Sequence, residues 1–301
     1  MENNRKKVLV TGASGLIGRE LCKQLSSDIY DVIGVDNNQR FKDVVPVNCK
    51  FICQDLSEFY QQTTNNFDLI FHLAAVNGTE YFYSDPSGTL INNTRIDLNT
   101  FDYAATNRNC KLIYSSSSEV VAGTDVVPTD EIVDITIHNI HNPRWSYRLP
   151  KILSENYLTN SNINYLIVRF FNVFGSNSGS GHFIRDIVEK IKNQEHTLMG
   201  ADETRSFCYV EDAVDALIHV SQTTEKQVVN IGNDQEVSIL EAANIIAREV
   251  FDKTINWKMV AGRVGSVSRR SPAIRKLKEI YPTYSPRSFE ESIKTIKDSL
   301  K

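Results

Sequence analysis

The feature that most constrains the fold of this chain is a glycine-rich turn, TGASGLIG, at residues 11–18. The apolar run Lys7–Val10 precedes it and apolar residues at helical spacing follow it, so the glycines join a buried strand to a helix. In such a turn Gly12 permits the tight bend, Gly15 lets the backbone approach a pyrophosphate, and Gly18 lets the helix pack closely on the sheet. The phosphates then lie at the positive end of the helix. The turn predicts a dinucleotide-binding α/β domain.

An acidic residue follows the turn at the distance expected for a ribose contact. The segment Asp31–Val35 predicts a second strand, and Asp36 stands at its end, about 20 residues beyond the turn. A carboxylate here accepts hydrogen bonds from the adenosine ribose and repels a 2′-phosphate. The sequence therefore favours NAD over NADP, and nearby Arg40 is the residue that would suit NADP instead.

Short apolar segments recur along the first half of the chain, with helix-capable stretches between several of them. This alternation is typical of an α/β, Rossmann-type fold with a doubly wound parallel sheet. The predicted strands are Val8–Val10, Val32–Val35, Phe51–Cys53, Leu69–Leu73, Lys111–Tyr114 and Leu166–Val168. Ligands of such sheets bind beyond the carboxyl ends of the strands. The candidate binding residues follow five of the strands there: Gly12, Asp36, Asp55, Leu73–Ala75 and Ser115–Glu119.

The character of the sequence changes after about residue 172. A polar, glycine-rich segment occupies residues 176–181, and helices with N-terminal capping boxes are predicted to begin after Ser238 and Ser288. We therefore expect an NAD-binding Rossmann domain at residues 1–172. Residues 173–301 are expected to form a smaller α/β lobe that binds the substrate, with Val228–Ile231 returning to the sheet as a strand.

Composition excludes several classes of protein. A net charge of −4 over 301 residues gives no support for a nucleic-acid surface. No apolar run approaches the length of a membrane helix, and the first strand begins too early to leave room for a signal peptide, so a cytoplasmic protein is expected. The five cysteines are odd in number and irregularly spaced, as expected of reduced core residues, and neither they nor the histidines show the spacing of metal ligands.

Tyr147 and Lys151 form the second informative motif. Oxidation of an alcohol needs a base that takes the hydroxyl proton while hydride leaves the same carbon for a nicotinamide. A free tyrosine has a pKa of about 10, and a lysine one helical turn away favours its phenolate. Pro150 is tolerated only near a helix start, so the helix is predicted to begin within one or two residues of Tyr147, with Ser146 as its cap.

Taken in order, these residues resemble the extended short-chain dehydrogenase/reductase family, and within it the NAD-dependent nucleotide-sugar epimerases, dehydratases and decarboxylases. The resemblance covers nearly the whole chain and rests on TGASGLIG, Asp36, Asp55-Leu56, His72-Leu-Ala-Ala75, Asn93, the Ser115–Glu119 run, Tyr147-x3-Lys151, Arg169-Phe-Phe-Asn172-Val-Phe-Gly175, Thr204-Arg205-Ser-Phe and Arg270-Ser-Pro-Ala-Ile.

The resemblance implies a catalytic set of Ser117, Tyr147 and Lys151, with Ser116 as the alternative serine, and a structural role for His72. It also implies NAD as the cofactor. The residues that it assigns to NAD binding are Gly12, Ser14, Gly15, Leu16, Ile17, Asp36, Asn37, Asp55, Leu56, Leu73, Ala74, Ala75, Asn93, Ser115, Tyr147 and Lys151.

Glu119 is the residue that separates the reaction classes within this family. The 4,6-dehydratases resembled here usually carry Thr-Asp-Glu where this chain has Ser117, Ser118 and Glu119, so the missing Asp weakens that interpretation. Decarboxylases tend to carry Thr-Ser-Glu there, with an arginine resembling Arg270 further on, and Glu119 would then be catalytic. Epimerases tolerate varied residues at these positions. Val121, where many relatives have tyrosine, makes the wall facing the sugar unusual.

The implied substrate is a nucleotide-diphosphate sugar. Arg205 and Arg270 are candidates for its diphosphate because a guanidinium binds phosphate in a bidentate fork, and Asn172 is expected to donate to the substrate. The favoured function is a 4-epimerase that passes through a C4 ketone. The alternatives are a nucleotide-uronate decarboxylase, a net nucleotide-sugar 4-dehydrogenase and a non-catalytic NAD-binding regulator. The resemblance further implies a homodimer built on two helices per subunit.

Overall fold

The structure is a computed structural model that describes residues 5–107, 109–137, 139–176, 178, 182–262 and 266–301. Part of the predicted polar segment 176–181, namely residues 177 and 179–181, lies outside this range. Within it, no helix combines the length and the apolar character needed to cross a bilayer.

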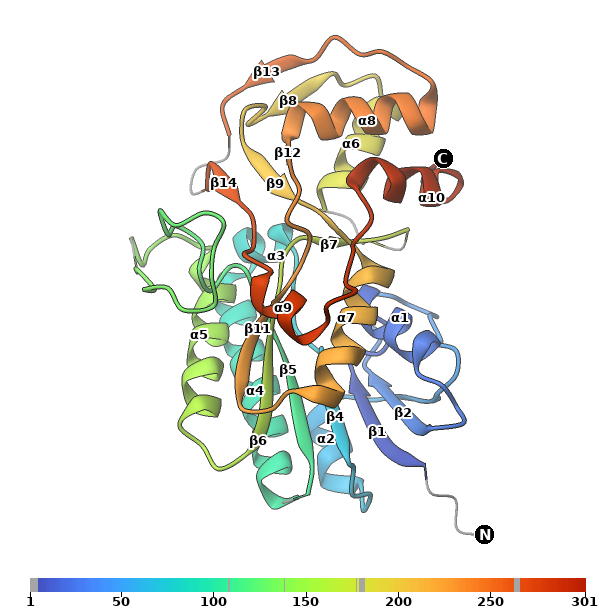
Figure 1. Ribbon diagram of the computed structural model, residues 1–301, viewed down its shortest axis with the longest axis vertical. Helices are drawn as coiled ribbons and strands as arrows, with labels where there is room; N and C mark the ends of the chain where they lie inside the picture. Colours follow the sequence, from blue (N-terminus) through green and yellow to red (C-terminus); the bar gives the residue numbers. More distant parts are fainter. Residues whose placement is uncertain (1–4, 108, 138, 177, 179–181, 263–265) are drawn as a thin grey trace.

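Seven parallel strands form the central sheet, in the order β11-β6-β5-β4-β1-β2-β3 (Figure 1). The predicted doubly wound parallel sheet is confirmed, and the segment predicted to return from the C-terminal third is its edge strand β11. The bounds are β1 (Lys6–Thr11), β2 (Tyr30–Asp36), β3 (Lys50–Cys53), β4 (Leu69–His72), β5 (Lys111–Ser117), β6 (Asn164–Phe170) and β11 (Gln227–Ile231).

Helices cover both faces of this sheet, because alternate residues of each strand point to opposite sides. Leu9 and Ile70 pack into one core and Val8 and Phe71 into the other. The first core lies under α2 (Leu56–Gln62), α4 (Pro86–Thr106) and α5 (Trp145–Thr159). The second lies under α1 (Leu16–Gln24), α7 (Val210–Thr223) and α9 (Arg275–Ile280). Helix α3 (Thr79–Ser84) lies between β4 and α4 in the chain.

The remaining elements form a smaller lobe beyond the carboxyl ends of the strands, at the top of Figure 1. Its helices are α6 (Phe183–Lys192), α8 (Ile239–Phe251) and α10 (Phe289–Leu300). Its strands pair as β12-β9-β14, β13-β8 and β10-β7. Their bounds are β7 (Val173–Phe174), β8 (Thr197–Met199), β9 (Thr204–Ser206), β10 (Cys208–Tyr209), β12 (Glu236–Ser238), β13 (Lys258–Val260) and β14 (Arg269–Arg270).

The two predicted helix caps in this lobe are present. The hydroxyl of Ser288 accepts from the backbone N–H of Glu291, and the carboxylate of Glu291 accepts from the backbone N–H of Ser288. The two bonds together form a capping box. Ser238 accepts from the N–H of Glu241 at 3.0 Å. Each cap satisfies donors that a helix start leaves free.

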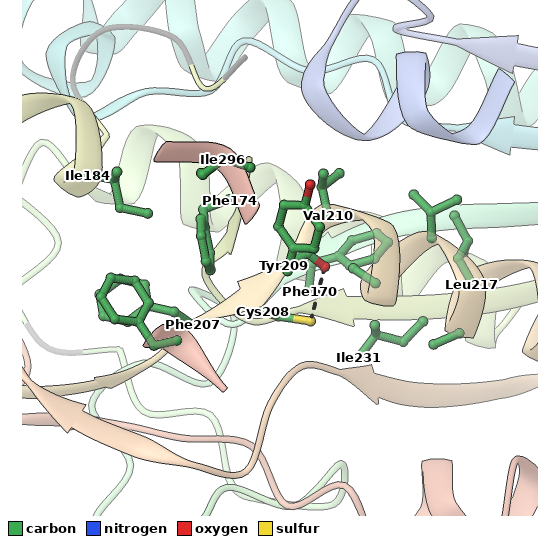
Figure 2. Packing of buried hydrophobic residues seen from close by; sticks show 14 of the residues in the cluster. Phe170, Phe174, Ile184, Phe207, Cys208, Tyr209, Val210, Leu217, Ile231 and Ile296 are labelled. Atoms are coloured by element: carbon green, nitrogen blue, oxygen red, sulfur yellow. Dashed lines mark hydrogen bonds between the residues drawn. The ribbon is translucent and has the colours of Figure 1, made fainter. Parts of the chain in front are cut away.

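One apolar cluster joins the small lobe to the sheet. Figure 2 shows Phe170 at the end of β6 and Leu217 of α7 in the same cluster as Phe174 of β7, Ile184 of α6 and Ile296 of α10. All five side chains are buried. The lobe is therefore held at the carboxyl end of the sheet by shared packing.

Candidate active site

The glycine turn lies at the point where the strand order reverses, between β1 and β4. Gly12 has a φ of +68°, and a Cβ there would lie 2.7 Å from the backbone nitrogen of Ala74. A Cβ on Gly18 would lie 2.2 Å from the carbonyl oxygen of Gly12. Both positions therefore need glycine, one for the bend and one for the close approach of α1. The loop Leu73–Ala75 after β4 forms the facing wall.

The residues of this turn fit a dinucleotide. The hydroxyl of Ser14 is fully buried and finds no hydrogen-bond partner among the described residues. A Cβ on Gly15 would meet only the carbonyl oxygen of Gly12, at 3.1 Å, among the atoms described. A pyrophosphate at a helix start needs hydrogen-bond donors and close access to the backbone. The hydroxyl of Ser14 can donate to it, and the space around Gly15 lets it approach. Leu16 and Ile17 begin α1 directly after this turn.

Asp36 stands at the end of β2 with its carboxylate beside the turn. Its two oxygens accept from the backbone N–H groups of Ser14, at 3.1 Å, and Asn38, at 2.8 Å. Arg40 points elsewhere, because its guanidinium donates to the carbonyl of Asn77 and lies 3.1 Å from the Nε2 of His182. The ribose position thus presents a carboxylate and not a guanidinium, as NAD requires.

The other predicted cofactor residues lie along the same edge of the sheet. Asp55 caps α2 by accepting from Ser57, and Leu56 is buried beneath it. Asn37 directly follows β2, and Ser115 lies on β5. Asn93 of α4 is 1 % exposed, and its amide both donates to the carbonyl and accepts from the N–H of Val76. It therefore fixes the loop after β4.

The serine run on β5 is sorted by the alternation of the strand. Ser116 is 2 % exposed and donates to the carboxylate of Glu155. Ser117, the next residue of the strand, lies close enough to Tyr147 for its hydroxyl to affect the pKa of the phenol. Burial raises the pKa of Tyr147, and the hydroxyl of Ser117 opposes that rise. The geometry thus pairs Ser117 with the tyrosine and gives Ser116 another partner.

Lys151 lies one turn after Tyr147 on α5 and is 1 % exposed. Its Nζ is 3.7 Å from the carboxylate of Asp97 and 4.5 Å from the ring centroid of Tyr114. Burial lowers the pKa of Lys151, and the charge of Asp97 opposes that effect. A buried ammonium one helical turn from a phenol can favour the phenolate once an alcohol proton has to be taken.

The start of α5 corrects one prediction. The helix begins at Trp145, within two residues of Tyr147 as expected, but its cap is Arg144 and not Ser146. Ser146 therefore lies inside the first turn, with its hydroxyl buried and unpartnered among the described residues, and Pro150 lies inside the helix. The earlier turn Asn142–Arg144 extends the helical bonding backwards, which sequence alone did not reveal.

Glu119 lies in a cluster of arginines next to Ser117. Its carboxylate accepts from Arg144 at 2.5 Å and from Arg270 at 2.8 Å. Burial alone would raise the pKa of Glu119, but the charges of Arg270 and Arg144 outweigh it and lower that pKa to about 2. At neutral pH this carboxylate is ionised and bridges two cations. Arg144 was not among the predicted site residues. Its position three residues before Tyr147 is the sequence feature that could have suggested a place in the site.

The cluster carries more positive charge than its carboxylate balances. Arg148 is buried and donates to the carbonyl of Val120, and the Nε of Arg270 is buried without a partner among the described residues. Arg205 lies close enough for the charges of Arg270 and Arg144 to add to the effect of burial in lowering its pKa. Such an excess suits an anionic ligand.

Arg205 and Asn172 lie where the small lobe meets the sheet. Arg205 is held by the carboxylate of Glu203, at 2.6 Å, and the hydroxyl of Ser266, at 3.0 Å. Asn172 follows β6 with a φ of +41° and donates from its amide to the carbonyl of Ser206, at 2.8 Å. Both face the region between the sheet and the lobe but already have protein partners.

A parallel sheet with a dinucleotide turn, and a tyrosine and a lysine on the helix beside it, defines the class of extended short-chain dehydrogenases/reductases. The chain belongs to the NAD-dependent epimerase/dehydratase family, whose family model matches residues 8–232. NAD is accordingly its cofactor.

Comparison with individual proteins agrees with this assignment. The chain is 30% identical to UDP-glucuronic acid decarboxylase 1 of Danio rerio, over 92% of this chain and 68% of that protein. It is 28% identical to UDP-N-acetyl-alpha-D-glucosaminuronate decarboxylase of Bacillus cytotoxicus, over 96% of both. Its fold matches the solved UDP-N-acetylglucosamine 4-epimerase of Methanobrevibacter ruminantium with a TM-score of 0.83 and 25% identity, over 98% of both chains.

Proposed function

We propose that this enzyme decarboxylates a nucleotide-linked uronate through a transient C4 ketone. The observation that carries the proposal is the bridge of Arg144, Glu119 and Arg270 beside the Ser117–Tyr147 pair. A sugar carboxylate at C5 is the anion that such a cluster would recognise. The sequence alone favours a 4-epimerase, and the cluster is what moves our preference to a lyase.

The chemistry follows from the residues that we assign to it. NAD bound in this turn would supply the hydride acceptor for C4 of the sugar, and the same hydride would reduce the C4 carbonyl again after carbon dioxide has left. Tyr147 takes the proton of the C4 hydroxyl, Ser117 holds that oxygen, and Lys151 stabilises the phenolate. The ketone then lies β to the carboxylate. The C5–C6 bond breaks, its electron pair moves toward the carbonyl oxygen, carbon dioxide leaves, and C5 takes a proton from solvent. Tyr147 then gives its proton back to the C4 oxygen as the carbonyl is reduced.

Arg270 and Arg144 have a defined part in this account. With Glu119 shared between them they hold a net positive charge where the sugar would lie. We assign the sugar carboxylate to these two guanidiniums and the diphosphate to Arg205, with Asn172 at the sugar. Glu119, ionised at neutral pH, orients the arginines and does not donate a proton.

The cofactor assignments complete the proposal. Gly12, Ser14, Gly15, Leu16 and Ile17 would hold the pyrophosphate, with Asp36 and Asn37 at the adenosine ribose. Asp55 and Leu56 would lie at the adenine. Leu73, Ala74, Ala75 and Ser115 would line the nicotinamide side, with Tyr147 and Lys151 at its ribose. Asn93 acts through the loop that it holds.

Two groups of relatives support the two leading reactions. The Danio rerio and Bacillus cytotoxicus proteins named above are decarboxylases, one of UDP-glucuronic acid and one of an N-acetylated uronate. The Methanobrevibacter ruminantium structure is a 4-epimerase. Epimerisation is the second candidate, because Ser117, Tyr147 and Lys151 suffice for it without the arginine cluster.

The test is a product analysis by mass spectrometry. The purified enzyme, with NAD, is given UDP-, GDP- and dTDP-linked uronates and the corresponding neutral hexoses. We expect a product lighter by carbon dioxide from at least one uronate and no turnover of the neutral sugars. An isomer of unchanged mass would establish epimerisation, and loss of two hydrogens would establish a dehydrogenase. Binding of NAD without turnover of any sugar would favour the regulator.

We also propose that the enzyme is a homodimer that pairs through α4 and α5. These helices pack together and expose large apolar side chains, with Ile91 and Leu153 each 46% and Tyr157 38% exposed. Light scattering after size exclusion should give twice the chain mass of 34.1 kDa, and Leu153→Glu should give the monomer. A monomeric wild-type protein would refute the assembly.

A further inference from the structure

A buried carboxylate that belongs to none of the catalytic motifs lies beside the lysine of the site. Asp97 of α4 is 1 % exposed, and its Oδ2 lies 3.7 Å from the Nζ of Lys151. Burying either charge alone is costly, whereas burying them as a pair is tolerated when hydrogen bonds satisfy the remaining atoms.

Three neutral donors provide those hydrogen bonds. The Nε2 of His72 lies 3.0 Å from one oxygen of Asp97. The hydroxyls of Tyr114, at 2.6 Å, and Ser154, at 2.8 Å, donate to the other. All three side chains are fully buried. Burial alone would raise the pKa of Asp97, but the charge of Lys151 and the bond from His72 keep it below its ordinary value.

The network continues to the turn that binds the cofactor. The hydroxyl oxygen of Thr11 accepts from the backbone N–H groups of Leu73 and Ala74, both at 3.2 Å. Its proton is then directed to the Nδ1 of His72, 2.8 Å away, which leaves the proton of Nε2 for Asp97. A continuous set of hydrogen bonds therefore links the cofactor turn and the facing loop to the carboxylate beside Lys151.

The other charged and titratable groups around Lys151 do not replace this carboxylate. Glu155, on the same helix, is paired with Arg169 of β6 at 2.6 Å. Tyr114 of β5 has its pKa raised well above the ordinary value by burial and by Asp97, so it stays neutral. Burial lowers the pKa of His72, which is neutral as well. Tyr147 is the phenol on which the lysine is to act.

We propose that Asp97 is the positioning residue of the catalytic lysine: it is the counterion that keeps Lys151 charged and in place inside the protein. The proposal rests on the role assigned above to Lys151 and not on which sugar reaction follows. Without the carboxylate, the dry environment would favour the neutral amine, which cannot stabilise a phenolate.

The test is a double-mutant cycle of Asp97→Asn and Lys151→Met, read by melting temperature and by kcat against pH for the sugar reaction that the wild type performs. We expect Asp97→Asn to move the alkaline limb of kcat to lower pH by about one unit or more, because the ammonium has lost its counterion. In the Lys151→Met background the same change should lower kcat no further. The double variant should melt at a higher temperature than Lys151→Met, which buries a carboxylate without a counterion.

Ser154→Ala is the matched control, because it removes one neutral donor from Asp97 and leaves the charge pair intact. It should leave the alkaline limb in place. The proposal is overturned if Asp97→Asn lowers kcat and the melting temperature equally in both backgrounds with the alkaline limb unmoved. If Asp97→Asn does not fold alone, the comparison of Lys151→Met with the double variant decides. A double variant no more stable than Lys151→Met would refute the pairing whether or not any sugar is turned over.

Discussion

At Glu119 a single carboxylate meets two guanidinium groups, and its position between them decides what it can do. A carboxyl group acts as a general acid only when its surroundings keep its pKa near the working pH. The surroundings of Glu119 do the opposite and lower that pKa to about 2. The sequence identified the residue as a candidate for catalysis, but only the fold shows that Arg144 and Arg270 converge on it.

This ion cluster should make the stability of the protein depend on acid. The pKa of Glu119 falls on folding from 4.5 to about 2, which corresponds to on the order of 3 kcal/mol of stabilisation. Because the folded pKa is the lower one, this contribution is complete above pH 4.5 and is lost as the pH falls toward 2. Urea unfolding of the wild type and of Glu119→Gln should show this part of the pH dependence only in the wild type. Equal acid sensitivity of the two would contradict the ionised bridge.

Arg144 should set the preference for an acidic sugar. Arg144→Met removes one of the two cations proposed for the carboxylate, so KM for the uronate substrate should rise by about tenfold or more, while the Kd of the free nucleoside diphosphate should stay unchanged. Arg275→Met is the control, because Arg275 is 82% exposed on α9 and lies outside the proposed site. A parallel loss of affinity for both ligands would show that Arg144 serves the diphosphate instead.

At the scale of elements, the turn from β1 to α1 was the part most open to prediction. Glycine spacing after an apolar strand has few alternative explanations, because a Cβ at Gly12 or Gly18 would collide with backbone. The start of α5 was harder to predict from the sequence. A proline is a poor helix residue, so Pro150 led us to predict Ser146 as the cap, whereas the cap is Arg144 and Pro150 lies five residues after the first helical residue, Trp145.

Two glycines of this turn should respond differently to alanine. In Gly15→Ala the new Cβ meets, within the described part of the chain, one backbone oxygen at 3.1 Å, so the fold should survive while NAD affinity falls by about tenfold or more. In Gly18→Ala the Cβ lies 2.2 Å from the carbonyl oxygen of Gly12, so stability and NAD binding should both be lost. Thermal unfolding and NAD titration distinguish the two. Gly15→Ala with wild-type NAD affinity would place the pyrophosphate elsewhere.

At the scale of the whole molecule, the elements after residue 172 do not all belong to the small lobe. Edge strand β11 and helix α7 come from the C-terminal part of the chain yet belong to the sheet and its covering layer. The return of residues 228–231 to the sheet was predicted from their apolar run, but the packing of α7 on α1 has no local signal. The meeting of Glu119 with Arg270, 151 residues later, is equally non-local.

This sharing of the core predicts that residues 1–172 do not fold alone. Without α7 and β11, the face of the sheet that carries Val8, Phe71 and Ile113 loses part of its cover. The fragment should show no cooperative thermal transition and poor NMR dispersion, whereas the full chain should unfold in a single transition. A stable fragment that binds NAD would show that the N-terminal part is an independent domain.

The central claim, loss of a sugar carboxylate after oxidation at C4, is tested most directly by following two isotopes in one reaction. A UDP-linked uronate labelled with ¹³C in its carboxyl group, shown to be turned over in the substrate panel, is incubated with the enzyme and NAD in D₂O. We predict ¹³C-labelled carbon dioxide and a nucleotide-linked pentose with a single deuterium at C5, because C5 takes a deuteron from the solvent in place of the lost carboxyl carbon. A nucleotide-sugar product that retains the ¹³C carboxylate and carries no deuterium at C5 would contradict the account, and such a product of unchanged mass would establish an epimerase.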